Sequence, residues 1–263
     1  MLLYVEAIED PARFRSIART VAATKPVVAL FGGRTAPGAR AAAAHTGAVA
    51  NSDQAIDEFL AECGIVRVES LRRLLLAAKG FGRFPQGFGK RMLLLSNSGG
   101  PGVVCADRTA SEGLELPALP TDMAEKLRAL FPAEASVANP LDLLADARED
   151  RFGPALEMAF ATRHHFDAIL MIHVVPFMVD AGPVVAALAR IASTAPLPVL
   201  HSMMGTISGK AEWFAQMEAA GVPMFDDVEA MAECASLVAR YPGLRERAQT
   251  TNAGPLRFKA RTA

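Results

Sequence analysis

Short apolar runs alternate with amphipathic helical stretches along almost the whole chain, and this alternation constrains the fold more than any other feature. The apolar runs cover residues 2–7, 26–31, 65–69, 92–96, 168–174, 198–203 and 222–225. The segments that predict helices cover residues 11–23, 52–63, 70–79, 122–131, 183–193, 209–220 and 227–240. Runs that are apolar on both faces and lead into helices are typical of parallel strands covered by helices on both sides. The sequence therefore predicts an α/β fold with parallel sheets.

A glycine-rich stretch, GFGRFPQGFGK at 80–90, divides this pattern in two. It lacks apolar periodicity, which is typical of a linker. We therefore expect two α/β domains, at residues 1–82 and 90–245, and a loose polar tail at 246–263. The second has enough apolar runs for an open sheet of its own. The first has only three, so we expect it to be truncated at its N-terminus.

Composition excludes several classes of protein. The formal net charge of −1 leaves no basic excess to neutralise phosphates, so we expect neither nucleic acid nor a membrane surface as a partner. The first residues are too acidic for a signal peptide, and no apolar run approaches membrane-spanning length. Cys63, Cys105 and Cys234 have no metal-ligand spacing, which predicts no metal site and a reducing, cytoplasmic location. The position of Cys105 near a helix start could lower the pKa of its thiol.

The segment SNSGGPG at 96–102 follows an apolar run and precedes a helical stretch. Gly99 and Gly100 let the backbone approach a ligand closely, and Pro101 suits the first position of a helix. Free N–H groups at a helix start, with the positive end of the helix dipole behind them, favour phosphate or another anion. A tight turn that binds nothing fits the glycines equally well, because the segment is neither a P-loop nor a complete dinucleotide fingerprint.

A long segment at 32–53 contains His45 among small residues, in AAAAHTGAVA. It follows an apolar run, which predicts an excursion at the ligand-binding edge of the sheet, where Arg34 and Arg40 could hold an anion. A surface loop or an alanine-rich helical turn with a histidine of no special role is the alternative. Loops of this length are uncommon in compact domains and tend to be functional, which favours a role for His45.

Glu6 ends the first apolar run and should lie at the edge where the His45 segment emerges. A carboxylate bonded to one imidazole nitrogen fixes the tautomer and leaves the other nitrogen free as a nucleophile. An ordinary acidic residue at a strand end is the alternative.

Other polar residues carry weaker signals. His164 and His165 lie in a polar turn, where we expect solvated rings, whereas His173 and His201 lie in apolar runs, where we expect hydrogen-bonded core histidines. The stretch NPLDLLADARED at 139–150 is expected as a loop that either lines the ligand edge or is a plain turn.

Four of these segments resemble, in order, segments of the nucleoside-diphosphate-forming acyl-CoA synthetases, the superfamily of succinyl-CoA synthetase and ADP-forming acetyl-CoA synthetase. GRTAPGARAAAAHTGAVANSD is similar to the family's phosphohistidine segment, and LLYVEAIEDPARF to the strand whose glutamate hydrogen-bonds that histidine. SNSGGPGVVCADRTASEGLELPAL is similar to a phosphate-facing turn and helix, and NPLDLLADA to a later N-P-[VL]-D-L motif. The resemblance covers nearly the whole chain and implies two flavodoxin-like, succinyl-CoA synthetase-like domains with parallel sheets.

The resemblance implies that His45 carries phosphate on Nε2 between an acyl phosphate and a nucleotide, while Glu6 orients the ring. It also implies that N–H groups of the glycine turn hold the phosphate. The phosphate-binding residues that we expect on this basis are Ser98, Gly99, Gly100, Gly102, Arg34, Thr46 and Gly47.

The resemblance further implies CoA, a carboxylic acid and ATP or ADP with Mg²⁺ as reaction components. The family's main CoA-binding and ATP-grasp domains are absent from this chain, so we expect partner domains or subunits to supply them. Phe31 and Ala44 stand where the family often has lysine and serine. A catalytically silent remnant that binds an anion or a partner protein is the alternative. The sequence leaves the acyl substrate, the choice of ATP or GTP and a homo-oligomer open.

Overall fold

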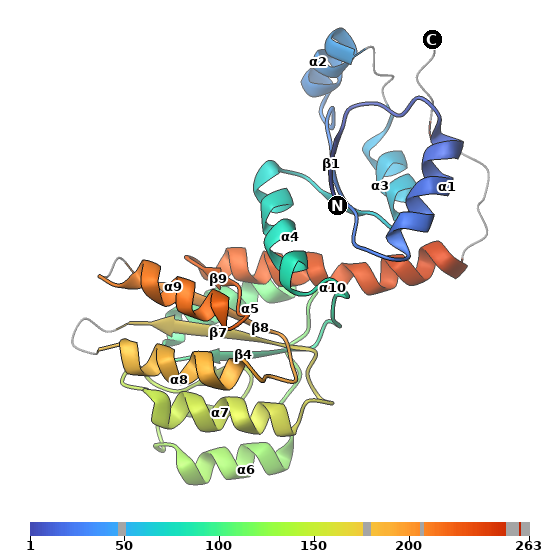
Figure 1. The fold of residues 1–263 in the computed structure, drawn as a ribbon. Coiled ribbons are helices and arrows are strands. Elements are labelled where there is room, and N and C mark those ends of the chain that lie inside the picture. Colours follow the sequence, from blue (N-terminus) through green and yellow to red (C-terminus); the bar gives the residue numbers. More distant parts are fainter. Residues whose placement is uncertain (47–50, 176–179, 206–207, 251–257, 259–263) are drawn as a thin grey trace. The chain divides into compact units, whose positions relative to one another are not determined.

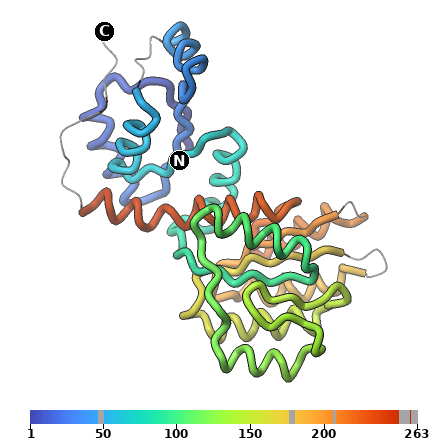
Figure 2. The backbone as a smooth tube through the Cα atoms, turned by 180° about the vertical axis from the view of Figure 1, so that it is seen from behind, coloured from blue at the N-terminus to red at the C-terminus, as the bar shows by residue number. Residues whose placement is uncertain are grey.

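The computed structural model describes residues 1–46, 51–175, 180–205, 208–250 and 258 (Figure 1). The chain divides into two compact units, one formed by Met1–Gly87 with Leu237–Ala263 and the other by Phe88–Ser236. Helix α10 (Val228–Thr250) is one continuous element that begins in the second unit, and its residues from Leu237 onward belong to the first (Figure 2).

The course of α10 changes two expectations about the end of the chain. Residues 237–245, which the sequence pattern groups with the second domain, belong to the first unit. The expected loose tail is wrong for residues 246–250, which are helical. Tyr241 gives the physical reason, because its ring is fully buried and its hydroxyl donates a 2.8 Å hydrogen bond to the carbonyl of Ala22.

The first unit is built on a three-stranded parallel sheet in the order β1-β2-β3. The strands are β1 (Leu2–Val5), β2 (Val28–Phe31) and β3 (Val66–Val68). Its helices, besides the end of α10, are α1 (Pro11–Ala22), α2 (Ala36–Thr46), α3 (Asp53–Glu62) and α4 (Leu71–Arg83). α1 and α3 share one hydrophobic cluster with the sheet, which Phe258 joins.

Sequence signals explain where two of these helices begin. Asp10 caps α1 by accepting a hydrogen bond from the Arg13 N–H, and Pro11 follows at the first helical position. Ser52 caps α3 in the same way through the Ala55 N–H (3.2 Å). The linker predicted at 80–90 is wrong for residues 80–83, which continue α4.

The second unit has a six-stranded sheet in the order β5-β6-β4-β7-β8-β9, parallel except for the β5–β6 pair. The strands are β4 (Met92–Ser96), β5 (Ser136–Val137), β6 (Leu141–Asp142), β7 (Ala168–Val174), β8 (Val199–Met204) and β9 (Met224–Phe225). The helices are α5 (Gly99–Ser111), α6 (Thr121–Leu130), α7 (Glu149–Ala161), α8 (Gly182–Ala192) and α9 (Lys210–Ala219). α7 and α8 cover one face of this sheet, and α5 with the start of α10 covers the other (Figure 1). This α/β architecture with two mainly parallel sheets confirms the predicted fold class.

The stretch at 139–150 is more ordered than expected. Leu141 and Asp142 form β6 beside β4, and α7 begins at Glu149. The Asn139 side chain accepts a hydrogen bond from the Leu94 N–H and donates to the carbonyl oxygens of Met92 and Pro117. Asn139 therefore binds the edge of β4 in the manner of a neighbouring strand.

Two buried histidines and the three cysteines lie in these cores. Both ring nitrogens of His201 and Nδ1 of His173 are buried without a hydrogen-bond partner in the described part of the chain, so the expected hydrogen-bonded core histidines are wrong for these atoms. Burial lowers the pKa of His173 to about 4. All three cysteines are buried, and burial raises the pKa of Cys63 and Cys105 to about 12. The expected low pKa of Cys105 is therefore wrong, because burial disfavours the thiolate and Cys105 lies beyond the first turn of α5.

None of the described helices is both long and apolar enough to cross a membrane.

Candidate functional site

Three side chains of the first unit form a hydrogen-bonded chain at the end of β1. His45 Nδ1 lies 3.1 Å from Glu6 Oε2, and the Tyr4 hydroxyl donates a 2.8 Å hydrogen bond to Glu6 Oε1. Tyr4 comes from β1, Glu6 follows it directly, and His45 lies in the last turn of α2. The structure thus brings Glu6 and His45 together, and it adds Tyr4, which sequence reasoning missed although it stands two residues before Glu6.

The segment that carries His45 is a helix, so the expected long loop is wrong and the alternative of an alanine-rich helical turn describes it better. Thr35 begins it by accepting the Gly38 N–H with its hydroxyl oxygen (3.2 Å), and the alanines that follow are strong helix formers. Gly33, at φ +84°, turns the chain, and a Cβ there would lie 3.7 Å from the Ala42 methyl group. Small residues therefore let α2 fold back closely enough for His45 to reach Glu6.

Electrostatics fix the roles of the two ring nitrogens of His45. The hydrogen bond from Tyr4 lowers the pKa of Glu6 most, and the hydrogen bond from His45 lowers it further. The carboxylate is therefore ionised near neutral pH. An ionised carboxylate can only accept hydrogen bonds, so the contact requires the hydrogen on Nδ1, and in the neutral ring this leaves the lone pair on Nε2. The His45 side chain is 77% exposed, which leaves Nε2 accessible to a reactant. The negative end of the α2 dipole would also stabilise positive charge on this ring.

A pocket of about 750 Å³ adjoins the Tyr4–Glu6–His45 chain. Its walls come from the end of β1, the segment that follows it, the first turns of α1 and the end of α2, and they include Phe14 and Ile17. Glu9, Asp10 and Arg13 are the further charged residues of this lining.

The other expected phosphate-binding residues of this unit have varied surroundings. Arg34 Nε donates to Asp53 Oδ1 over 3.3 Å, and Arg40 is exposed. The Thr46 hydroxyl donates to the Ala42 carbonyl of its own helix over 2.9 Å. Gly47 lies outside the described residues.

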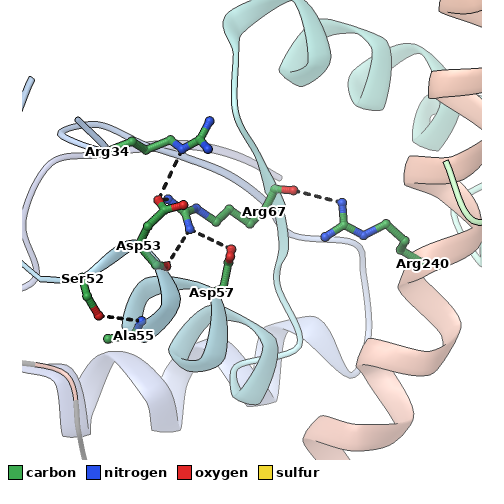
Figure 3. A network of polar contacts seen from close by, with 7 residues as sticks. All are labelled: Arg34, Ser52, Asp53, Ala55, Asp57, Arg67 and Arg240. Carbon is green, nitrogen blue, oxygen red and sulfur yellow. Dashed lines mark hydrogen bonds and ion pairs between the residues drawn. The ribbon is translucent and has the colours of Figure 1, made fainter. Parts of the chain in front are cut away.

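Asp53 belongs to a polar network that the sequence did not predict (Figure 3). Arg67 of β3 is only 5% exposed at its side chain and donates to the carboxylates of Asp53 and Asp57 as well as to the Asp53 carbonyl. Burial alone would raise the pKa of Asp53, but hydrogen bonds from Arg67 and Arg34 outweigh it and lower that pKa. Arg240 of α10 donates in turn to the Arg67 carbonyl (3.3 Å). An arginine inside the apolar run IVRVE was the one available signal, since such a residue needs buried partners.

The glycine turn of the second unit differs in detail from expectation. α5 begins at Gly99, two positions before the expected first helical residue Pro101, and Ser98 is its N-cap residue. The Gly102 N–H donates to the Ser98 carbonyl (3.1 Å), so this donor is already engaged within the helix, and a phosphate-binding role for Gly102 stays a prediction. Gly99 and Gly100 are exposed in the first turn, where backbone N–H groups have no acceptor within the helix. Asp142 lies beside this turn, since a Cβ on Gly99 would be 3.3 Å from its carboxylate.

The two candidate parts lie in separate units, His45 in the first and the Gly99 turn in the second. The prediction that both contact one phosphate stays a prediction. Among the described residues, no group of three or more His, Cys, Asp and Glu side chains could hold a metal ion.

Comparisons with known proteins agree with this fold. Residues 1–81 match the family model of the succinyl-CoA ligase-like flavodoxin domain. The alpha subunit of ADP-forming acetate–CoA ligase II of Pyrococcus furiosus is 32% identical over 239 residues, which cover 89% of this chain and 51% of that subunit. ADP-forming acetate–CoA ligase I of Archaeoglobus fulgidus is 34% identical over 158 residues, or 60% of this chain and 23% of the relative.

Solved structures show the same likeness. The dinucleotide-forming acetyl-coenzyme A synthetase 1 of Ca. Korarchaeum cryptofilum, in complex with phosphate and ADP, superposes with a TM-score of 0.85 at 26% identity. That match covers 97% of this chain and 55% of the synthetase. The chain spans about half the length, or less, of these relatives. It therefore belongs to the family of NDP-forming acetyl-CoA synthetases, with a succinyl-CoA ligase-like flavodoxin domain at residues 1–81, and corresponds to part of the full-length enzymes.

Proposed function

We propose that this chain is the phosphohistidine-carrying part of an ADP-forming acyl-CoA ligase, in which His45 moves a phosphoryl group between an acyl phosphate and a nucleotide. The contact between His45 Nδ1 and Glu6 Oε2 carries the proposal, because it leaves Nε2 as an exposed nucleophile beside a negative charge. Relatives named as ADP-forming acetate–CoA ligases support the reaction class.

The transfer step follows from the two ring nitrogens. The Nε2 lone pair attacks the phosphorus of the acyl phosphate, the bond between phosphorus and the acyl oxygen breaks, and the carboxylate leaves with the electron pair. The Nδ1 hydrogen stays between the ring and Glu6, whose charge stabilises the imidazolium that forms. Attack by a terminal phosphate oxygen of ADP then breaks the N–P bond and returns the ring to its neutral state. Each step is also proposed to run in reverse.

Other residues are proposed to bind phosphate rather than to react with it. The N–H groups of Gly99 and Gly100 and the Ser98 hydroxyl would donate to it in the second unit, at the positive end of α5. Arg34 would contribute a charge in the first unit after partial release from Asp53. CoA and nucleotide binding are proposed to come from partner domains or subunits, since two relatives are named as alpha subunits.

Phosphate loading of His45 tests the proposal directly. The protein is incubated with γ-labelled ATP, Mg²⁺ and an ATP-grasp subunit of an ADP-forming acetate–CoA ligase, and acid-labile label is then measured. We expect label on the wild-type chain, none on His45→Ala, and loading slowed about tenfold or more in Glu6→Gln, as is typical when the partner of a functional imidazole is removed. His164→Ala is the matched control, because that histidine is also exposed and lies outside the site.

The proposal fails if label is equal on wild type and His45→Ala, or if the wild-type chain stays unlabelled with every ATP-grasp subunit tried. The second outcome would favour a catalytically silent module that binds a partner protein rather than an anion. Two observations favour that second candidate: the Gly102 N–H already has an acceptor, and Arg34 is paired with Asp53.

A further inference from the structure

We propose that Tyr4 is a positioning residue for His45: its hydroxyl holds the Glu6 carboxylate in the orientation that keeps the hydrogen on Nδ1 and leaves Nε2 as the nucleophile. The effect of this positioning on phosphoryl transfer rests on the proposed function. The tautomer of His45 that the inference predicts can be measured without any phosphate.

Glu6 uses one carboxylate oxygen for each neighbour. Oε1 accepts from the Tyr4 hydroxyl at 2.8 Å and Oε2 contacts His45 Nδ1 at 3.1 Å. A carboxylate is planar, so a hydrogen bond at Oε1 also fixes the direction in which Oε2 points. Without it, Glu6 could rotate about its side-chain bonds and lose the line to Nδ1.

Gly32 lies against the Tyr4 and Glu6 side chains and limits the space around them. Its N–H donates to the Val5 carbonyl over 2.8 Å, which ties it to the strand that carries Tyr4. A Cβ at Gly32 would lie 3.1 Å from the Tyr4 hydroxyl and 3.4 Å from Glu6 Cγ. The two side chains therefore rest against a position that tolerates no side chain without a shift.

The Tyr4 hydroxyl is directed to Glu6 although solvent is available to it, since the residue is 64% exposed. A hydrogen bond to an ionised acceptor is stronger than one between neutral groups, which explains the choice. The same bond is the largest cause of the lowered pKa of Glu6 and of the raised pKa of Tyr4. By making Glu6 a weaker base, Tyr4 keeps the shared hydrogen on His45.

None of the other charged residues that line the pocket is among the causes that shift the pKa of Glu6. Glu9, Asp10 and Arg13 line the adjoining pocket, and the Asp10 carboxylate is engaged with the Arg13 N–H as the cap of α1. Tyr4 and His45 lower the pKa of Glu6 more than Thr46, whose contribution is the smallest.

The test reads the tautomer of His45 from its ring ¹⁵N chemical shifts in the full chain at pH 7.5, with His45→Ala used to assign the signals. We expect the Nδ1–H form to dominate in wild type. In Tyr4→Phe the ratio of Nδ1–H to Nε2–H should fall about two- to tenfold, the factor that corresponds to the net contribution of one hydrogen bond. Gly32→Ala should shift the ratio in the same direction, because its methyl group displaces the hydroxyl.

Tyr241→Phe is the matched control. It removes the same atom from the chain's other tyrosine, whose hydroxyl bonds the Ala22 carbonyl in the same unit. An unchanged ratio in Tyr4→Phe would overturn the inference, as would an equal shift in Tyr241→Phe.

Phosphate loading separates this inference from the proposed function. If Tyr4→Phe shifts the tautomer and loads phosphate about two- to tenfold more slowly, both stand. If wild-type protein never loads phosphate but the tautomer shifts, the positioning role stands and the proposed function fails. If wild-type protein loads phosphate while the tautomer is insensitive to Tyr4, the positioning role alone is wrong.

Discussion

Helices α2 and α5 start in similar local settings but differ in how many of their residues are buried. Each follows the end of a buried strand and starts with small residues. α2 buries only Ala42 among its residues whose burial is described, whereas α5 buries Gly102, Cys105 and Thr109. A helix with few buried contacts opens locally at low cost, while one fixed in the core opens only with its unit. The proposed phosphate carrier thus lies on the weakly held helix, and the proposed phosphate-binding turn on the firmly held one.

Placing a charged side chain at a buried position should give the largest difference in stability cost between the two helices. We expect Cys105→Asp to lower the free energy of unfolding of the second unit by at least about 3 kcal/mol, because it buries an unpaired carboxylate. Ala42→Asp should cost the first unit only about 1 kcal/mol, since α2 can move the side chain into solvent.

Urea unfolding measures the first value through Trp213, the chain's single tryptophan, which lies in α9 of the second unit. Exchange of the β1–β3 amide hydrogens measures the second. Equal losses would show that α2 is as firmly held as α5.

Acid should weaken the second unit before the first. His173 has a folded-state pKa of about 4 against an ordinary 6.5, and the pKa of His201 is also lowered. Below pH 6.5 the unfolded chain binds protons that the folded chain does not, so stability present above pH 6.5 is lost as the pH falls toward 4. We expect a loss on the order of 2–3 kcal/mol for His173, which its removal in His173→Leu should largely abolish.

In the first unit, burial lowers the pKa of the Met1 amine from 8.0, so the loss from this group begins below pH 8, before the pH range compared here. The carboxyl groups of this unit with lowered pKa values are those of Glu6 and Asp53, whose ordinary values are 4.5 and 3.8. Their contribution is lost only below that range. Trp213 fluorescence in urea at pH 7, 5.5 and 4.5, beside amide exchange in β1–β3, follows both units, and a first unit that weakens earlier would contradict the assignment.

Glycine substitutions at the two helix starts should have opposite signs. Gly33→Ala places a side chain at φ +84° and should cost the first unit about 1–2 kcal/mol. Gly100→Ala meets no atom within 4 Å inside a helix and should stabilise the second unit by about 0.5–1 kcal/mol. Amide exchange and Trp213 fluorescence respectively measure the two effects. A stabilising Gly33→Ala would mean that this turn does not hold α2 in place.

Periodicity predicted most of the longer elements, because burial on one or both faces leaves a regular pattern in the sequence. β5 and β6 have two residues each, too few for a pattern; β6 is held by pairing with β4, and β5 by pairing with β6. α7 was not predicted because Gly153 and Pro154, which are unfavourable inside helices, interrupt its helical pattern. α2 was not predicted as a helix because an alanine run has no amphipathic face.

The proximity of Glu6 and His45 was predictable because Glu6 and the start of the His45 segment follow the ends of two paired parallel strands. Sequence could not show that Ser98 starts α5 early and so engages the Gly102 N–H. It also could not show that Tyr4 turns toward Glu6, because an alternating strand position only tells which face a side chain takes.

The burial of the three thiols has a practical consequence. A thiol held at a pKa of about 12 inside a core reacts slowly with alkylating reagents, since both access and thiolate are lacking. Cys63 lies in the first unit, and Cys105 and Cys234 lie in the second. Alkylation followed peptide by peptide would therefore time the opening of each unit separately in the unmodified wild-type chain. Because the native thiols react slowly, a single cysteine introduced on α2 could be labelled selectively with a spectroscopic probe beside His45.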